Sequence, residues 1–227
     1  MGSAETAQSS DGRARYLHPI NTSDGRRVRG EQRRARVLEA GVVLATTAGL
    51  DGFSLDRLAA ESGVSKGGVQ ILFGDKAAVQ RAIVAAARRE VRTKVLVPAA
   101  EADHGIERLL RLGEQWIDHM IDTADNGGCF FCATWSGLPS RPGPLRDLVA
   151  EDRTAWLTGL AAMIEHGVAA NQIDGDHGSP DELAIVLLGL GLTINGAIQY
   201  GDWGPATEAP AVAAARQTWV SAVRRLR

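Results

Sequence analysis

The sequence has few cysteines, few aromatic residues and no long hydrophobic run. Two cysteines stand among 227 residues, and Phe, Trp and Tyr together make up 5%. No stretch of about 18 or more uncharged apolar residues occurs, the length that a transmembrane helix requires, so we expect no membrane as a partner. The first 25 residues lack the apolar core of a signal peptide. We expect a disordered segment there and a cytoplasmic protein.

Cys129 and Cys132 form a C-x-x-C pair. This spacing occurs in redox pairs and in half of a zinc site. A structural zinc usually needs four ligands, and no second cluster of Cys or His stands nearby in the sequence, so we predict no metal site. We interpret both residues as free cysteines that pack as small hydrophobes on one face of a helix, with a redox role as the open alternative.

The sequence also lacks two frequent catalytic motifs. Neither the metal-binding H-E-x-x-H nor the phosphate loop G-x-x-x-x-G-K-[ST] occurs. We therefore predict no catalytic residues, no cofactor and no enzymatic activity. An enzyme built on the C-terminal part of the chain is the rival interpretation.

Charge is distributed unevenly along the chain, although the net charge is only −2. Residues 26–97 carry 14 Lys or Arg and 7 Asp or Glu, a balance of +7. Residues 98–227 carry 9 and 17, a balance of −8. The basic segment favours a polyanionic partner, and a solvated charge distribution without a partner is the alternative.

The basic segment has the pattern of several helices in succession. Its arginine-rich start, residues 26–36, leads into apolar positions at helical spacing that end near Gly49. Two short helices joined by a three-residue turn that contains glycine form a helix-turn-helix. The expected caps and helices are Ser54 before 55–61, Ser65 before Lys66–Phe73, and Asp75 before a helix that reaches about Val97.

Two glycines, Gly67 and Gly68, begin the second of these short helices. A helix-turn-helix places its second helix in the DNA major groove, with the N-terminal residues at the base edges. Glycines there allow a close approach, the exposed N–H groups favour an anion, and Lys66 adds positive charge. The alternative is a helical hairpin inside a bundle, where glycines only permit close packing.

The stretch from Arg33 to Val84 resembles the N-terminal domain of the tetracycline-repressor (TetR) family of transcriptional regulators. The most specific matches are residues 53–55, 58–59, 63–67 and 73–76. This resemblance implies a recognition helix at Lys66–Phe73, a phosphate-contacting lysine at Lys76, and a ligand-binding C-terminal domain whose last two helices form a homodimer.

Gln70 and Ile71 occupy places where the family usually has tyrosine. Glutamine can pair with adenine N6 and N7, and Ile71 can pack on a thymine methyl group. We expect Val69 and Phe73 to face the domain core, and the arginines of residues 26–29 to precede the first helix as a basic arm. The predicted DNA contacts are Arg29, Arg33, Ser54, Ser65, Lys66, Gly67, Gly68, Gln70, Ile71 and Lys76.

The rest of the chain is predicted to stay helical. The helix over residues 181–200 is apolar on nearly every side, so we expect it to be buried all round, partly against a second copy of the chain. Gly189, Gly191 and Gly196 would permit close approach of helices. A central helix of a monomer is the alternative.

Aromatic and soft side chains gather in the acidic part of the chain. Pockets for small molecules are mostly apolar with a few polar groups, so these residues indicate a pocket for a small hydrophobic or amphipathic effector. Ordinary core packing is the alternative for each of them. The predicted pocket residues are Trp116, His119, Met120, Phe130, Phe131, Trp135, Trp156 and Asn195.

These patterns predict an all-α protein in three parts. Residues 1–28 would form a flexible basic arm, residues 29–76 a helix-turn-helix domain, and residues 77–227 a ligand-binding and dimerisation domain. We interpret the chain as a repressor at the nucleoid that binds a palindromic double-stranded DNA operator as a dimer and leaves it when an effector binds. An architectural DNA-binding protein without a ligand is the rival interpretation.

Overall fold

The computed structural model describes residues 22–137 and 142–227, and it confirms the all-α prediction: these ranges contain no β-strand. Residues 1–21 of the predicted flexible arm lie outside the described residues. In chain order the elements are α1 (Thr22–Ala48), α2 (Leu55–Ser62), α3 (Lys66–Phe73), α4 (Lys76–Val91), a π-helical turn (Arg92–Leu96), α5 (Val97–Ala100), α6 (Ile106–Asp122), a 3₁₀ turn (Ala124–Asn126), α7 (Phe130–Gly137), α8 (Pro144–Ala169), a 3₁₀ turn (Gly175–His177), α9 (Pro180–Tyr200) and α10 (Ala209–Arg224).

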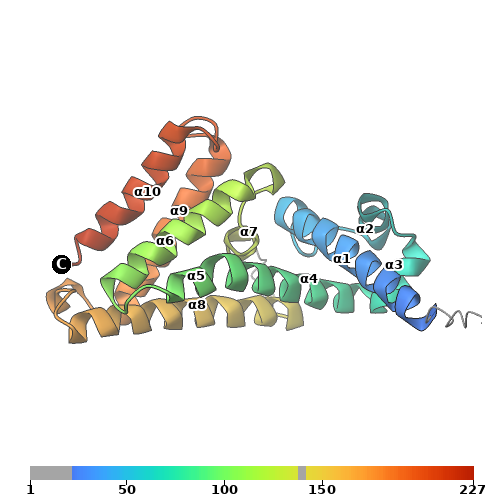
Figure 1. The fold of residues 1–227 in the computed structure, drawn as a ribbon, viewed down its shortest axis with the longest axis horizontal. Helices are drawn as coiled ribbons and strands as arrows, with labels where there is room; N and C mark the ends of the chain where they lie inside the picture. Colours follow the sequence, from blue (N-terminus) through green and yellow to red (C-terminus); the bar gives the residue numbers. More distant parts are fainter. Residues whose placement is uncertain (1–21, 138–141) are drawn as a thin grey trace, which may run out of the picture.

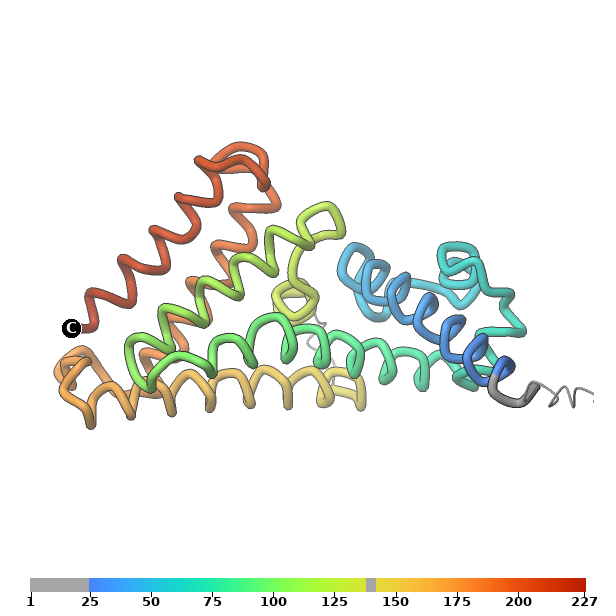
Figure 2. Tube along the Cα trace, viewed as in Figure 1, coloured from blue at the N-terminus to red at the C-terminus, as the bar shows by residue number. Residues whose placement is uncertain are grey.

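The molecule is elongated, with helices α1 to α3 at one end and the C-terminus near the other (Figure 1). Helices α4 and α5 run on from α3 along the length of the molecule, with α8 beside them. Helices α6, α9 and α10 form the opposite side of the larger part, and Figure 2 shows the same path as a Cα trace. Helix α4 therefore connects the two parts directly.

The three predicted caps of the N-terminal helices are confirmed. Ser54 Oγ accepts a hydrogen bond from Arg57 N at 3.1 Å, and Ser65 Oγ accepts one from Gly68 N at 3.2 Å. Asp75 Oδ1 accepts one from Ala78 N at 2.7 Å. Gly63 ends α2 in the left-handed region at φ 62°, a conformation that glycine adopts without strain. These local signals fix the angles at which the short helices meet.

The start of α1 differs from the prediction. Residues 22–28, predicted as part of a flexible arm, are helical, so Arg26, Arg27 and Arg29 lie on α1 and not before it. Arginine is a good helix former, and the pair of Arg27 Nη1 with Glu31 Oε1 at 3.0 Å spans one helical turn. The arginine run therefore extends the helix.

The end of the connecting helix also differs from the prediction. Helix α4 ends at Val91, and the chain continues through the π-helical turn into α5. Helix α5 ends at Ala100, three residues beyond the predicted end at Val97. Pro98 is the second residue of α5, directly after the π-helical turn, and it does not interrupt the helical backbone. Helical backbone therefore runs from Lys76 to Ala100 with one irregular turn.

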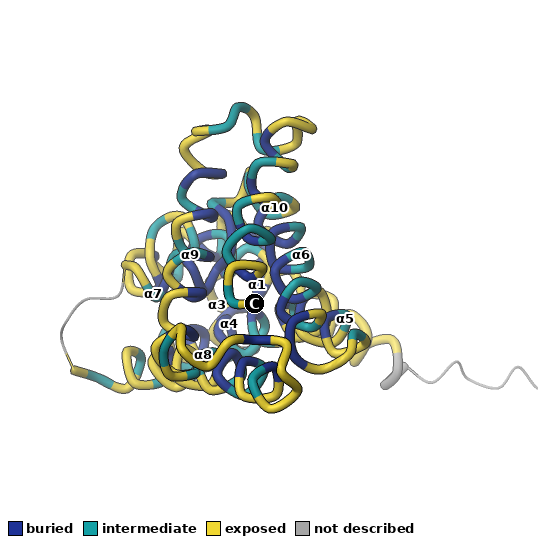
Figure 3. Tube along the Cα trace, turned by 90° about the vertical axis from the view of Figure 1, so that its left-hand side faces the viewer, coloured by how far each residue is buried: buried dark blue, intermediate teal, exposed yellow. Residues whose placement is uncertain are grey.

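Two tryptophans organise the core of the C-terminal part. Trp116 and Trp219 are each 1% exposed, and their rings meet edge to face at 6.1 Å. Trp219 Nε1 donates a hydrogen bond to the carbonyl oxygen of Leu109 at 2.9 Å. A Cβ at Gly113 would overlap the Trp219 ring, and one at Gly191 would overlap the Trp116 ring. Figure 3 shows that buried positions lie mostly where helices face one another, with exposed positions on the outside.

Within the protomer, helix α9 is buried on one side only, so the predicted burial on all sides would require a second copy of the chain. Ile185 is 55% exposed and Val186 is 63% exposed, and a Cβ at Gly189 or Gly196 would meet open space. The opposite side is buried, with Gly191 against Trp116. A helix that is apolar on nearly every side contacts its own chain on one side only, so an apolar stripe remains on the protomer.

Helix α9 is also the one helix in the described ranges that is long and apolar enough to cross a membrane by length and composition. Half of its most apolar window is buried inside the protomer. Helices of protein cores pass the same test, so the criterion alone is weak support for a membrane span.

Replacing Gly191 by Ala should destabilise the fold, because the added methyl group overlaps the Trp116 ring. We expect a loss of about 1–3 kcal/mol in the free energy of unfolding, measured by chemical denaturation. Gly30→Ala is the matched control, since no atom lies within 4 Å of a Cβ at this helical position. It should be neutral or stabilise by up to about 1 kcal/mol. Equal effects of both changes would contradict this packing.

Candidate DNA-binding face and effector cavity

Helix α3 presents two side chains outward and anchors a third. Gln70 is exposed and Ile71 is 88% exposed, whereas Val69 is fully buried as predicted. Phe73, predicted to face the core, is half-buried against it. The predicted base-reading pair therefore stands on the open side of the helix.

The two glycines at the start of α3 have different environments. A Cβ at Gly67 would meet nothing within 4 Å, whereas a Cβ at Gly68 would lie 3.0 Å from Val64 Cγ1 and 3.1 Å from Ser65 Oγ. Gly67 thus leaves open space at the helix start, which a phosphate or a base edge could occupy. Gly68 serves the packing of the turn. The open space at Gly67 fits the alternative of a close approach to DNA. The close contacts at Gly68 fit the alternative of packing within the protein.

Both predicted basic contacts near α3 have partners within the chain. Lys66 Nζ lies 2.9 Å from Asp56 Oδ2, in a pair whose side chains are both more than half exposed. Lys76 Nζ donates a hydrogen bond to the carbonyl oxygen of Asp51 at 2.9 Å and lies 5.5 Å from the centre of the Phe53 ring. Exposed contacts of this kind are weak, so both ammonium groups can exchange them for a phosphate.

Arg34 joins α1 to α3, a role that the sequence did not reveal. Its Nη1 donates to the carbonyl oxygen of Leu72 at 3.0 Å, and its guanidinium lies 4.2 Å from the centre of the Phe73 ring. This contact holds the arginine-rich start of α1 beside the end of α3 (Figure 1). Arg29 and Arg33, the predicted contacts on α1, are exposed on the same stretch of helix.

Residues 63–67 also spell G-x-S-x-G, the pattern around the nucleophile of many hydrolases. That nucleophile requires a sharp turn from a strand into a helix. Here helix α2 precedes the turn, and Ser65 Oγ accepts the N–H of Gly68 as a helix cap. The pattern therefore has a structural explanation in the helix-turn-helix.

An apolar cavity of about 390 Å³ lies between α4, the π-helical turn, α6, α7 and α8. We call it the aromatic cavity. Three predicted pocket residues, Phe131, Trp135 and Trp156, line it. Their rings form a series, with centroids 5.3 Å apart between Phe131 and Trp135 and 6.0 Å apart between Trp135 and Trp156. Its volume lies in the range of pockets that hold small molecules.

The other predicted pocket residues lie elsewhere. Trp116 and Met120 are core residues, and the Trp116 ring packs on Trp156 at 4.7 Å. His119 and Phe130 line a second, larger cavity of about 560 Å³ between α1, α4 and the end of α6. Asn195 accepts the N–H of Cys129 at 3.1 Å. The sequence identified the aromatic cluster but could not separate cavity walls from core.

Cys129 and Cys132 are buried free cysteines at the start of α7. Hydrogen bonding from the Cys132 side chain lowers the pKa of Cys129 well below its usual range, and His119 acts in the same direction. Burial raises the pKa of Cys132 well above its usual range. Within residues 22–137 and 142–227, no group of three or more His, Cys, Asp or Glu side chains is placed to hold a metal ion.

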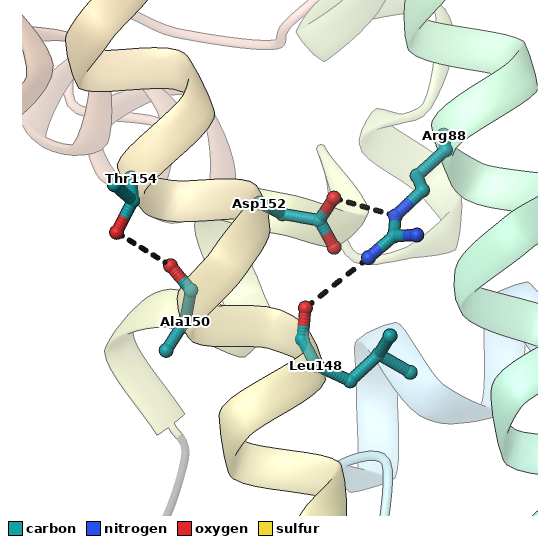
Figure 4. A network of polar contacts seen from close by, with 5 residues as sticks. All are labelled: Arg88, Leu148, Ala150, Asp152 and Thr154. Atoms are coloured by element: carbon teal, nitrogen blue, oxygen red, sulfur yellow. Dashed lines mark hydrogen bonds and ion pairs between the residues drawn. The ribbon is translucent and has the colours of Figure 1, made fainter.

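One arginine of α4 holds two oxygen atoms of α8 beside the aromatic cavity (Figure 4). Arg88 Nε donates to Asp152 Oδ1 at 2.5 Å, and Arg88 Nη2 donates to the carbonyl oxygen of Leu148 at 3.2 Å. Burial raises the pKa of Asp152, and Arg88 opposes this shift. We call these contacts the Arg88 clamp. Arg88 and Asp152 both line the cavity.

Comparison with known proteins supports the interpretation of the chain as a transcriptional regulator. Residues 105–210, which include α6 to α9, match the family model described as the tetracyclin repressor-like C-terminal domain. The C-terminal part of the chain therefore matches a domain of the TetR family of transcriptional regulators. No curated protein sequence matches the chain significantly.

Solved structures of TetR-family regulators share the fold at low sequence identity. A TetR transcriptional regulator from Chloroflexus aurantiacus J-10-FL is 20% identical, with a TM-score of 0.70 over 86% of this chain and 95% of its own. A TetR-family regulator from Agrobacterium tumefaciens is 18% identical, with a TM-score of 0.70 over 87% and 98%. AibR, solved with isovaleryl coenzyme A and operator DNA, is 17% identical, with a TM-score of 0.67 over 83% and 96%.

Changing Lys76 to Ala should weaken binding to all DNA sequences alike, because phosphate contacts carry no sequence information. We expect the slope of log affinity against log salt to flatten by about one unit, measured by fluorescence anisotropy at several salt concentrations. Lys76→Arg should keep the slope. An unchanged slope in Lys76→Ala would remove Lys76 from the phosphate contacts.

Proposed function

We propose that this protein is a TetR-family repressor that binds a palindromic DNA operator as a homodimer and leaves it when a small effector binds. Residues 29–76 would read the DNA, with the arginines at the start of α1 following the phosphate backbone. Residues 77–227 would bind the effector and the second copy. Such a protein acts in the cytoplasm, at the nucleoid.

The observation that carries the DNA-binding proposal is the outward face of α3. The helix exposes the side-chain amide of Gln70 and the aliphatic side chain of Ile71. Both lie near Gly67, where the backbone is accessible because no atom lies within 4 Å of a Cβ. A glutamine amide can donate to N7 and accept from N6 of adenine, and an aliphatic group can cover a thymine methyl. The two readers are one residue apart, so they would contact neighbouring base pairs.

The apolar stripe on α9 supports the homodimer. It contains Ile185, Val186, Gly189 and Gly196 at spacings of three, four and seven residues, on one face of the helix. Open space above the two glycines lets a second helix approach closely. Because a two-fold dimer presents two α3 helices, it fits successive major grooves of a palindrome about 34–36 Å apart.

Helix α4 is the route by which an effector would act on DNA binding. Its first residue follows α3 by three positions, and its last turns line the aromatic cavity through Arg88 and Val91. An effector shifts the equilibrium only if it binds the DNA-free conformation more tightly than the DNA-bound one. A ligand in this cavity would do so if it fits only when α4 has moved relative to α8.

Changing Gln70 to Ala should reduce discrimination at one or two base pairs of the operator. The operator is first selected from random double-stranded DNA. We then expect the variant to lose about 1–3 kcal/mol of binding free energy on this cognate site. Binding to random DNA should stay within the error of the wild type. Equal losses on both DNAs would show that Gln70 does not read bases.

Changing Val186 to Glu should break the dimer, since it places a charge in the apolar stripe of α9. Sedimentation velocity at micromolar concentration should show a dimer for the wild type and a monomer for the variant. Val97→Glu is the matched control, because Val97 is 50% exposed but lies on α5, away from the stripe. A wild-type monomer, or a dimer of the Val186 variant, would contradict the proposed interface.

A further inference from the structure

Three residues that line the aromatic cavity each carry a buried polar atom without a hydrogen-bond partner among the described residues. These atoms are Nε1 of Trp135, Nε1 of Trp156 and Oδ2 of Asp152. A buried donor or acceptor without a partner destabilises a protein, because its lost hydration is not replaced by a hydrogen bond. Three such atoms around one cavity indicate that a bound molecule provides their partners.

The chemical types of these atoms define what that molecule must carry. An indole N–H can only donate, so each tryptophan requires an acceptor atom on the ligand. An ionised carboxylate can only accept, so Asp152 Oδ2 requires an N–H or O–H donor. The remaining wall, which includes Leu112, Phe131 and Met163, requires an apolar body.

The carboxylate of Asp152 disfavours an anionic group at its free oxygen. The Arg88 guanidinium is paired with Asp152. Arg108, the other arginine of the wall, donates to the carbonyl oxygens of Ala100 and Ala102 at 3.0 and 2.7 Å. A carboxylate in the cavity would lie beside Asp152, and like charges at this distance repel each other.

The same atoms lie at the contact that joins α4 to α8. Asp152 uses one oxygen for Arg88 and has the other without a partner (Figure 4). A ligand donor on the second oxygen would draw the carboxylate away from Arg88. One turn after Arg88 the helix enters the π-helical turn, whose Leu96 also lines the cavity. Such turns are frequent at functional sites, and this one gives the connecting helix a place to bend.

From these contacts, and resting on the proposed function, we propose the class of the effector and the way it acts. The effector is an uncharged or cationic molecule with an apolar, ring-sized body, at least one hydrogen-bond donor and at least one acceptor. Its acceptor binds the indole N–H groups, its donor binds Asp152, and its binding weakens the Arg88 clamp. Because the three polar atoms are buried, the cavity wall must move as the ligand enters, and this movement displaces α4.

Three probes with the same ring test the effector class by isothermal titration calorimetry on the full-length protein. They are 2-naphthol, 6-(aminomethyl)-2-naphthol and 6-hydroxy-2-naphthoate, which are neutral, cationic and anionic near pH 7 and all carry a hydroxyl group that can accept from an indole N–H. We expect the first two to bind at least about tenfold more tightly than the carboxylate, as one repulsive charge contact predicts. Binding of none of the three, or equal or tighter binding of 6-hydroxy-2-naphthoate, would overturn the proposal.

Two variants locate the probes at the proposed atoms. Asp152→Asn keeps the size of the side chain and removes its charge, so the preference for the amine over the carboxylate should fall to within about threefold. Trp135→Phe keeps a ring and removes the N–H, and it should weaken 2-naphthol about fivefold, the loss of one hydrogen bond. Thr154→Ala, on the same helix, should change neither value, since Thr154 is exposed and does not line the cavity. Unchanged selectivity in Asp152→Asn would show that the probes bind elsewhere.

Operator binding separates this inference from the proposed function. The amine should weaken wild-type binding to the selected operator at least about tenfold, and this response should be lost in Asp152→Asn. If the wild type binds no double-stranded DNA, the proposed function fails. If it binds the operator but the amine has no effect on it, or if Asp152→Asn responds like the wild type, only the present inference fails.

Discussion

Helix α4 has to contact two different parts of the protein, and most of the structure depends on this requirement. Ile83 packs so closely on α1 that only a glycine, Gly41, fits opposite it. Farther along, Val91 and Val95 are buried in the larger part. A helix is rigid over a few turns, so a movement of α4 at α8 is transmitted to α3. The π-helical turn interrupts this rigid connection only after Val91.

Polar contacts and apolar packing have different roles along this connection. Apolar contacts of α4 are non-directional and allow small shifts. The Arg88 clamp is directional, because a guanidinium donates along fixed directions to Asp152 and to a carbonyl oxygen of α8. A contact of this kind can be present in one arrangement of two helices and absent in another. It is therefore suited to distinguish two states, while the surrounding core remains packed in both.

Much of the N-terminal part could be predicted because its signals are local. Ser54, Ser65 and Asp75 cap their helices through backbone groups three residues away, so the sequence alone indicates them. The role of Arg34 could not be predicted, because its partners Leu72 and Phe73 lie about 40 residues away in the sequence. For the same reason, the apolar pattern of α9 did not reveal which of its sides meets the rest of the protomer.

The sequence by itself determined the helical class, the helix-turn-helix with Gln70 and Ile71 on α3, and the presence of an aromatic cluster. Each follows from periodicity, from caps or from composition, which act over a few residues. Only the tertiary structure decided that Trp135 and Trp156 line a cavity while Trp116 is core, and that Arg88 meets Asp152. Cavities and long-range pairs arise where helices meet, and their relative placement depends on packing over the whole chain.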